Sequence, residues 1–256
     1  MELIDSHAHL DAGQFARDLP QVLERARQRG VKYIITVGTD LSSSIKAIEI
    51  ASRYPFVFAS VGVHPHDADK VEGTTLKKLG ELARQPRVVA IGETGLDYYR
   101  NYSPRPKQQQ LFRQQIKLAK DTGLPLIIHQ RHAQDELLAI MDKEEGWEGG
   151  GVMHCFSGSQ QYARQCLEKG FYLSFAGNIT FPKTTLLRVI ARETPIERIL
   201  IETDSPYLAP QSYRGRRNEP SYVELVAQKI AELKGLSVEK CGKMVTANLQ
   251  RVFKLE

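Results

Sequence analysis

The sequence predicts one α/β domain, covering residues 1–256, whose eight parallel strands close into a TIM (β/α)8 barrel. Short runs rich in Val and Ile alternate along the chain with longer segments of helical periodicity, the pattern of a parallel sheet with crossover helices. The runs at 33–35 (YII) and 125–128 (PLII) are apolar without alternation, as expected for strands buried on both faces. A length of 256 residues is also typical of one such barrel.

Each apolar run ends at a turn signal, and a helical segment follows it. The strands are expected at residues 3–5, 32–37, 57–63, 88–91, 124–128, 152–154, 172–175 and 199–201. Helices are expected between them at 20–28, 41–53, 74–84, 107–121, 133–143, 160–169 and 183–192, and at 221–233 and 238–253 after the last strand. Gly30, Gly123 and Gly170 follow three of these helices, where a left-handed C-cap favours glycine. No linker divides the pattern. A doubly wound open sheet stays the alternative, because one sequence does not give strand order.

The composition indicates a soluble globular protein, with 41% hydrophobic and 25% charged residues and no run of the roughly eighteen apolar residues that span a membrane. The formal charge of +5 mildly favours an anionic partner such as nucleic acid, although on charge alone a slightly basic solvated surface is the better explanation. Cys155, Cys166 and Cys241 form no C-x-x-C pair, which favours a reducing compartment. No signal-peptide-like stretch precedes Ser6, so we expect a cytoplasmic protein with no membrane partner.

Strong metal-ligating residues recur where the predicted strands end. They are His7, His9, His64, Glu93, His129, His154 and Asp204. Taken singly, each histidine is more commonly a hydrogen-bonded structural residue. The carboxyl ends of barrel strands converge on one opening, however, and catalytic groups of this fold lie there. We therefore expect these side chains to meet around one small volume.

The mixture of imidazole and carboxylate groups predicts a metal centre. Nitrogen and oxygen donors together suit Zn²⁺, Mn²⁺ or Fe²⁺, and Mg²⁺, which prefers oxygen, stays among the candidates. The six expected ligands are His7, His9, Glu93, His129, His154 and Asp204. Six ligands exceed what one tetrahedral ion takes, so we expect two divalent ions, an arrangement that favours phosphoryl-ester hydrolysis.

Acidic residues near this centre are the candidates for catalysis. We expect Asp204 both to bind metal and to accept a proton from the attacking water. Glu202 lies on the same face of the last strand and either supports the metal site from behind or forms a salt bridge inside the barrel. Glu93 is expected to be a buried carboxylate that needs cationic partners, and Asp97 is a candidate for orienting its neighbours.

Basic and aromatic residues are candidates for substrate contacts. Arg131 and Arg214 are expected to hold phosphate, because a guanidinium binds it bidentately, and Asn218 is expected to contact substrate from the same loop as Arg214. The rest of the segment at 214–220 is expected to be a solvated loop. Near Arg100, the tyrosines at 98, 99 and 102 are suited to stacking on bases, but we expect at least two of them to pack against a helix.

The motifs together resemble a known family. They are IDSHAHL at 4–10, GVHPH at 62–66, IGETGLDY at 91–98, HQR at 129–131, HCFSG at 154–158, ETDSPYL at 202–208 and RNEP at 217–220. In order and spacing this set resembles the TatD-type metal-dependent deoxyribonucleases, which belong to the amidohydrolase-like barrels. The motifs extend over nearly the whole chain. None is specific alone, whereas the ordered set is highly specific.

The resemblance implies a TIM barrel that hydrolyses phosphodiester bonds of DNA, with 3′-5′ exonuclease action as one form of that activity. It implies that two ions are bound by the six residues named above and that Glu93 bridges them. It also implies a role for His64 in contacting substrate or its phosphate. The sequence departs from the family at His132, where an Asp is common after the arginine of H-x-R, and this affects only a local contact of that acid.

Two other functions fit the same residues. One is hydrolysis of a small-molecule ester, lactone or amide at the same metal site, because a fold alone does not identify a substrate. The other is nucleic-acid binding without catalysis, which the modest positive charge permits. We expect DNA to be the substrate and the protein to be a monomer.

Overall fold

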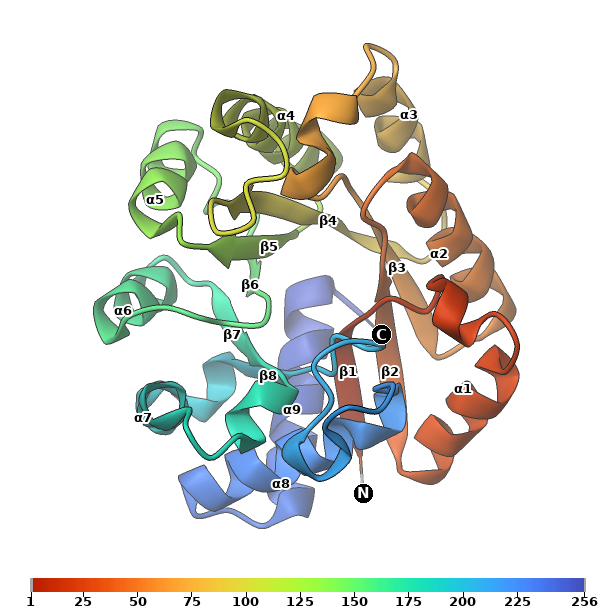
Figure 1. Ribbon diagram of the computed structural model, residues 1–256, viewed down its shortest axis with the longest axis vertical. Helices are drawn as coiled ribbons and strands as arrows, with labels where there is room; N and C mark the ends of the chain where they lie inside the picture. Colours follow the sequence, from red (N-terminus) through yellow and green to blue (C-terminus); the bar gives the residue numbers. More distant parts are fainter. Residues whose placement is uncertain (1, 256) are drawn as a thin grey trace.

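The computed structural model describes residues 2–255, and its eight strands form one parallel sheet in the order β1 to β8. The strands are β1 (Leu3–Ala8), β2 (Val31–Val37), β3 (Val57–Val61), β4 (Val88–Asp97), β5 (Leu126–Arg131), β6 (Gly151–Met153), β7 (Tyr172–Phe175) and β8 (Ile199–Ile201). A parallel bridge between Ala8 and Ser205 joins the end of β1 to the segment after β8, so the sheet curls into a nearly closed barrel (Figure 1). This order confirms the barrel, because a doubly wound sheet reverses its strand order at a switch point.

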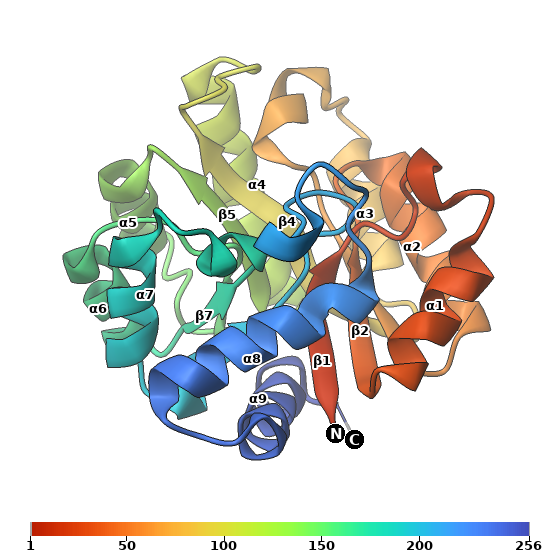
Figure 2. The same cartoon turned by 60° about the horizontal axis from the view of Figure 1, so that its bottom comes forward.

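Helices surround the strands (Figure 1). They are α1 (Leu19–Gln28), α2 (Leu41–Arg53), α3 (Thr75–Leu82), α4 (Arg105–Thr122), α5 (Gln134–Lys143), α6 (Gln160–Glu168), α7 (Thr185–Glu193), α8 (Val223–Lys234) and α9 (Val238–Phe253). Helix α9 lies near the N-terminal end of β1 (Figure 2), where Gly242 approaches Glu2 so closely that a Cβ would lie 2.2 Å from the Glu2 carbonyl oxygen. Within residues 2–255, no helix has both the length and the apolar character needed to cross a bilayer.

The strands carry the core, because their side chains are buried on both faces of the sheet. Ile34, Ile35, Ile127 and Ile128 are all 0% exposed, which confirms that the non-alternating runs are interior strands. Burying a side chain of this size contributes roughly 1.5–3 kcal/mol. The barrel is therefore a packed scaffold on which side chains at the strand ends are held in fixed positions.

Local signals fix the helix ends. At the start of α2, the Asp40 carboxylate accepts a hydrogen bond from Ser43 N at 2.7 Å, and Ser43 Oγ accepts one from Asp40 N at 2.8 Å. Helix α4 ends at Gly123, whose φ of 67° is the left-handed conformation predicted for this cap. Gly30 and Gly170, with φ of 87° and 86°, confirm the other two predicted caps.

Three strands extend further toward the site than the apolar pattern predicts. Strand β1 continues to Ala8, β4 to Asp97 and β5 to Arg131. The predicted ends were wrong because they were placed at the first polar residue, whereas polar side chains in these strands find partners inside the barrel mouth. As a result His7, Glu93 and His129 project from strands rather than from the loops that follow them.

Candidate metal centre

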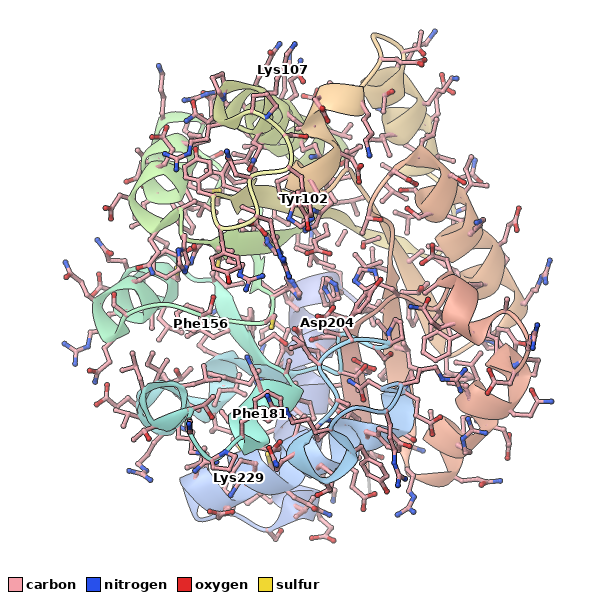
Figure 3. The ribbon with its side chains drawn as sticks, viewed as in Figure 1. Tyr102, Lys107, Phe156, Phe181, Asp204 and Lys229 are labelled. Carbon is pink, nitrogen blue, oxygen red and sulfur yellow. The ribbon has the colours of Figure 1, made fainter. Side chains whose placement is uncertain are left out.

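The predicted ligands gather at the C-terminal mouth of the barrel. A cavity of about 1040 Å³ opens there and is lined by His9, His64, Glu93, His129, His154 and Asp204, among others. His7 is fully buried, with its ring centroid 4.9 Å from that of His9. Figure 3 places Asp204 near the middle of the ring of helices, with Tyr102 on the loop after β4. Seven residues from six strand ends thus meet in one volume, as expected from the sequence.

Glu93 lies at the centre, and its two carboxylate oxygens face different histidines. Oε2 lies 3.3 Å from His7 Nε2 and 3.7 Å from His9 Nε2. Oε1 lies 2.9 Å from His129 Nδ1 and 3.1 Å from His154 Nε2. One carboxylate therefore connects two separate groups of nitrogen donors, as a bridging ligand between two cations would.

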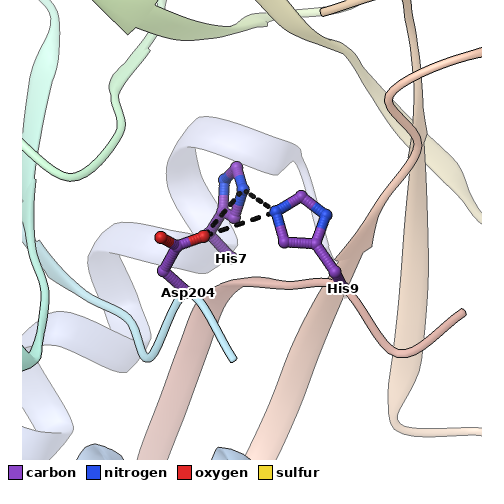
Figure 4. Close-up of side chains that lie close together, drawn as sticks. All are labelled: His7, His9 and Asp204. Atoms are coloured by element: carbon purple, nitrogen blue, oxygen red, sulfur yellow. Dashed lines mark hydrogen bonds and ion pairs between the residues drawn. The ribbon is translucent and has the colours of Figure 1, made fainter. Parts of the chain in front are cut away.

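Asp204 completes the group on the Oε2 side (Figure 4). Its Oδ1 lies 3.3 Å from His9 Nε2 and 3.8 Å from His7 Nε2. The two Nε2 atoms are themselves only 3.2 Å apart. Two nitrogen lone pairs at that distance repel each other unless a proton or a cation lies between them. The donor set of two imidazoles and two carboxylates fits a divalent transition metal.

The outer nitrogens of three histidines show which nitrogen faces the centre. Each lies near an oxygen that accepts hydrogen bonds: His9 Nδ1 is 3.3 Å from Val37 O, His129 Nε2 is 3.1 Å from Asp97 Oδ2, and His154 Nδ1 is 3.0 Å from Glu202 Oε1. The outer nitrogen of each neutral ring therefore carries the proton, and the inner nitrogen keeps its lone pair. This is the tautomer that a metal-ligating histidine requires, with the oxygen behind it fixing the ring.

His64 has the opposite arrangement, although it is close to Glu93. His64 Nδ1 accepts a hydrogen bond from His66 N at 3.1 Å, so the proton of the neutral ring is on Nε2, 3.3 Å from Glu93 Oε1. Burial lowers the pKa of His64 to about 4, against the opposing charge of Glu93, so the ring is neutral at pH 7. A protonated ring nitrogen donates a hydrogen bond and does not bind metal. His64 is therefore a donor that faces the cavity.

The carboxylates of the centre are held in their charged form. Burial opposes the charge of Glu93, but the imidazoles of His154, His64 and His7 bring its pKa well below the usual range. Burial likewise opposes the charge of Asp204, and the hydrogen bond that His9 Nε2 donates when its ring is protonated lowers the pKa of Asp204. Buried anions require cationic partners, which here are imidazolium groups or metal ions.

Strand β4 approaches β5 closely at this point because of a glycine. Gly95 has φ of 134°, and a Cβ on it would lie 2.0 Å from His129 O. Only glycine fits there, so Gly95 lets β4, which carries Glu93, lie close to β5, which carries His129. Gly92 permits a second close approach, because a Cβ there would lie 2.6 Å from Ile127 Cβ.

Backbone hydrogen bonds join β1 to the segment after β8. His7 O accepts from Asp204 N at 2.9 Å, and Ser205 O accepts from His9 N at 2.7 Å. Asp204 itself has φ of 55°, a conformation that is uncommon outside glycine and tends to occur at functional sites. Asp5, which the sequence did not single out, reinforces the join by accepting from Thr203 N at 2.8 Å.

Two predicted substrate contacts lie away from the cavity. Asn218 is fully buried, and its Nδ2 donates to Thr203 O at 2.8 Å and to Tyr207 O at 2.6 Å. Its amide therefore fixes the shape of the loop after β8. Arg214 is exposed and stacks its guanidinium on Phe181 at 4.8 Å, outside the cavity lining. Both side chains thus lie outside the cavity lining, and their contact with substrate stays a prediction.

Arg131 lies in the cavity lining, as expected, with its guanidinium 3.9 Å from the centroid of the Tyr99 ring. Tyr99 and Tyr102 are 52% and 64% exposed, so the expectation that at least two of the three tyrosines are packed is wrong. Only Tyr98 is held against α4, by a 2.9 Å hydrogen bond from Gln109. The exposed His132 ring packs edge-on against Tyr99, at 5.0 Å between centroids.

The sequence reasoning also missed His66, which lines the cavity. Its Nε2 lies 2.9 Å from Asp97 Oδ2, the same oxygen that holds His129. Asp97 thus orients both rings, which supports the positioning role considered for it. The signal was present in the motif GVHPH, where His66 follows His64 by two residues.

Comparison with known proteins agrees with this geometry. The family described as TatD related DNase matches residues 4–254. The metal-dependent hydrolase YabD of Bacillus subtilis (strain 168) is 46% identical over 254 residues, which are 99% of each chain. A Salmonella typhimurium protein named 3′-5′ ssDNA/RNA exonuclease TatD is 35% identical over 258 residues, 99% of each chain. The crystal structure of the TatD homologue YJJV of Escherichia coli K12 has a TM-score of 0.92 at 30% identity, over 99% of this chain and 98% of that one.

Proposed function

Because the chain belongs to the TatD family of metal-dependent hydrolases, we propose that it removes nucleotides from the 3′ end of single-stranded DNA. The observation that carries the proposal is the central position of Glu93, which offers one carboxylate oxygen to each of two donor groups. A pair of cations so placed suits hydrolysis of a phosphodiester. The relative named as a 3′-5′ ssDNA/RNA exonuclease supports the substrate class.

We assign the ligands of two divalent cations to the two sides of Glu93. His7, His9 and Asp204 would hold one of them, and His129 and His154, which both face Glu93 Oε1, would hold the other. Zn²⁺, Mn²⁺ and Mg²⁺ are the candidate ions. When bound, such ions stabilise negative charge on a phosphodiester and make water more acidic.

The other roles in the reaction fall to side chains of the site: proton transfer, phosphate binding and positioning of the histidine rings. Asp204, kept ionised by its lowered pKa, accepts the proton of the attacking water. His64 Nε2–H and the Arg131 guanidinium bind phosphate oxygens in the cavity. Glu202 and Asp97 act as positioning residues by holding the rings of His154 and His129.

The exposed residues at the rim of the cavity favour single-stranded over double-stranded DNA as the substrate. Tyr99 and Tyr102 present exposed rings on the loop after β4, and Arg100 and Arg131 lie beside them in the cavity lining. Aromatic faces stack on unpaired bases, and guanidinium groups follow the phosphate backbone. In a duplex the bases are already stacked on one another and are not free to make these contacts.

The test combines metal analysis with the lengths of products from 5′-labelled DNA. We expect two ions per chain, products that shorten by one nucleotide at a time from the 3′ end, and no turnover after metal removal. His129→Ala and Asp204→Asn should abolish cleavage while the fold is retained. Asp121→Asn, which neutralises an exposed aspartate on α4 outside the cavity lining, is the matched control.

Unchanged turnover in either site variant would refute the proposed centre. Cleavage of carboxylic esters or lactones in place of DNA would replace the substrate assignment with the small-molecule alternative. Retained DNA affinity without cleavage in Mn²⁺, Mg²⁺ or Zn²⁺ would favour a binding protein.

We also propose that the chain is one domain over residues 1–256 and a cytoplasmic monomer. The free thiols of Cys155, Cys166 and Cys241 agree with a reducing compartment, and one cooperative unfolding transition and a monomeric mass would test the rest.

A further inference from the structure

The turn after β7, η3 (Gly177–Thr180), brings an amide side chain to the wall of the same cavity. Asn178 belongs to the cavity lining. Its Oδ1 is buried, and among residues 2–255 it has no hydrogen-bond partner. Buried acceptors are almost always paired in folded proteins, so an unpaired one beside a cavity marks a place where another molecule supplies the donor.

The backbone that carries Asn178 is firmly held. Asn178 O accepts from Thr184 Oγ1 at 3.0 Å and from Phe181 N at 3.0 Å. Gly177 packs so tightly on the loop after β8 that a Cβ would lie 2.1 Å from Leu208 O. In Figure 1 this turn lies beside that loop at the mouth of the barrel. The backbone that carries this side chain is therefore in place before substrate arrives, so only the side chain has to be ordered on binding.

An exposed aromatic ring lines the same cavity. Tyr207 is 53% exposed, and its ring centroid lies 5.8 Å from that of His9. Its backbone is tied to the catalytic segment, because Tyr207 N donates to Asp204 O at 2.9 Å and Tyr207 O accepts from Asn218 Nδ2 at 2.6 Å. The cavity is thus lined by an amide side chain from one loop and an aromatic ring from the next, both on hydrogen-bonded backbone and close to the proposed metal ligands.

We propose that Asn178 hydrogen-bonds the edge of the nucleobase on the nucleotide being released, while Tyr207 supplies a surface on which that base stacks. This inference rests on the proposed nuclease function. A neutral amide has no charge with which to hold phosphate, whereas its one donor group and one acceptor match the adjacent donor and acceptor on a base edge. Rotation of the amide group about the Cβ–Cγ bond exchanges the positions of Oδ1 and Nδ2. The side chain therefore pairs with either order of donor and acceptor on a base edge and does not restrict the enzyme to one base.

The test uses the metal-loaded full chain and two 5′-labelled single-stranded oligodeoxynucleotides. One carries a normal 3′-terminal nucleotide, and the other carries an abasic tetrahydrofuran residue there. On the normal substrate we expect Asn178→Ala to lower kcat/KM about 10-fold, and Asn178→Ser, which keeps a hydroxyl, to lower it less. On the abasic substrate the wild type and Asn178→Ala should have equal rates, since no base is present to contact.

Gln211→Ala is the matched control, because Gln211 is an exposed amide on the neighbouring η5 (Gln211–Tyr213) and lies outside the cavity lining. We expect it to match the wild type on both substrates, and all variants to retain the wild-type metal content and unfolding midpoint. Equal rates for wild type and Asn178→Ala on the normal substrate would overturn the inference and leave the proposed function standing. A loss that persists on the abasic substrate would also overturn it. If the wild type cleaves neither oligonucleotide, both the proposed function and the inference fail.

Discussion

Glu202 provides a sharp test of how the metal centre is built. Its side chain is fully buried, and its Oε1 accepts hydrogen bonds from His154 Nδ1 at 3.0 Å and from Cys155 N at 2.7 Å. Glu202→Gln keeps the size of the side chain and a carbonyl oxygen that accepts both bonds, but it removes the negative charge. Glu202 itself does not line the cavity but holds two residues that do, His154 and Cys155, so we expect the change to act on metal binding rather than on the chemical step.

The magnitude follows from the loss of charge. A hydrogen bond to a charged group contributes about 1.5–3 kcal/mol and one between neutral groups about 0.5–1.5 kcal/mol, so the substitution should weaken the support of His154 by about 1–2 kcal/mol. That difference corresponds to roughly 5–30-fold weaker binding of the cation held by His154. Turnover at saturating metal should stay within a few-fold of the wild type, because the reacting groups are unchanged.

The assay is a titration of activity against buffered free metal, which gives metal affinity and maximal turnover separately. Glu193→Gln, which neutralises a partly exposed glutamate on α7, serves as the control. The reasoning is refuted if metal affinity is unchanged while turnover at saturating metal falls about 100-fold or more, since Glu202 would then act on the reacting atoms themselves.

Three further outcomes are expected. Tyr102→Ala should raise KM for single-stranded DNA roughly 10-fold, because stacking on one base contributes about 1–3 kcal/mol, and should leave hydrolysis of bis(p-nitrophenyl) phosphate unchanged. Burial opposes the charge of Glu219, but the hydrogen bond from Arg25 lowers its pKa, so its stabilising effect is present above the ordinary glutamate pKa and is lost as the pH falls through the lowered value. Glu219→Gln should therefore destabilise the protein by about 1–2 kcal/mol in urea melts at neutral pH and by much less in strong acid. Burial raises the pKa of Cys241 to about 11 and that of Cys166 to about 12, so neither thiol should be alkylated in the native protein near pH 8, whereas both should react after unfolding.

Much of the fold could be predicted because its signals are local. Apolar runs, helical periodicity and cap glycines act within a few residues, and α2 and α9 begin and end at the predicted residues. The ends of β1, β4 and β5 were not predictable in the same way. Whether a strand continues through His7, Glu93 or His129 depends on partners from other strands, and those partners are distant in sequence.

The candidate site was predictable as a set of residues but not as an arrangement. The position of ligands at strand ends already implies that they meet. The proton positions depend instead on the atoms behind each ring, such as Val37 O, which carry no sequence signature. The loop R-G-R-R-N illustrates the same limit: nothing in its letters shows that Asn218 turns inward to two carbonyl groups while Arg214 lies on Phe181.

The hydrogen bonds between the residues at 7–9 and those at 204–205 have a consequence for biosynthesis. During synthesis His7 and His9 leave the ribosome long before Asp204, the carboxylate that completes their group of donors, is translated. Until β8 and the segment after it are synthesised, the nascent chain has an incomplete group of donors, and the hydrogen bonds that join β1 to residues 204–205 are absent. Contacts between residues so far apart in sequence form late in folding. Hydrolytic competence should therefore appear only when the ring has closed, so that a truncated polypeptide would be an inert product rather than an uncontrolled enzyme.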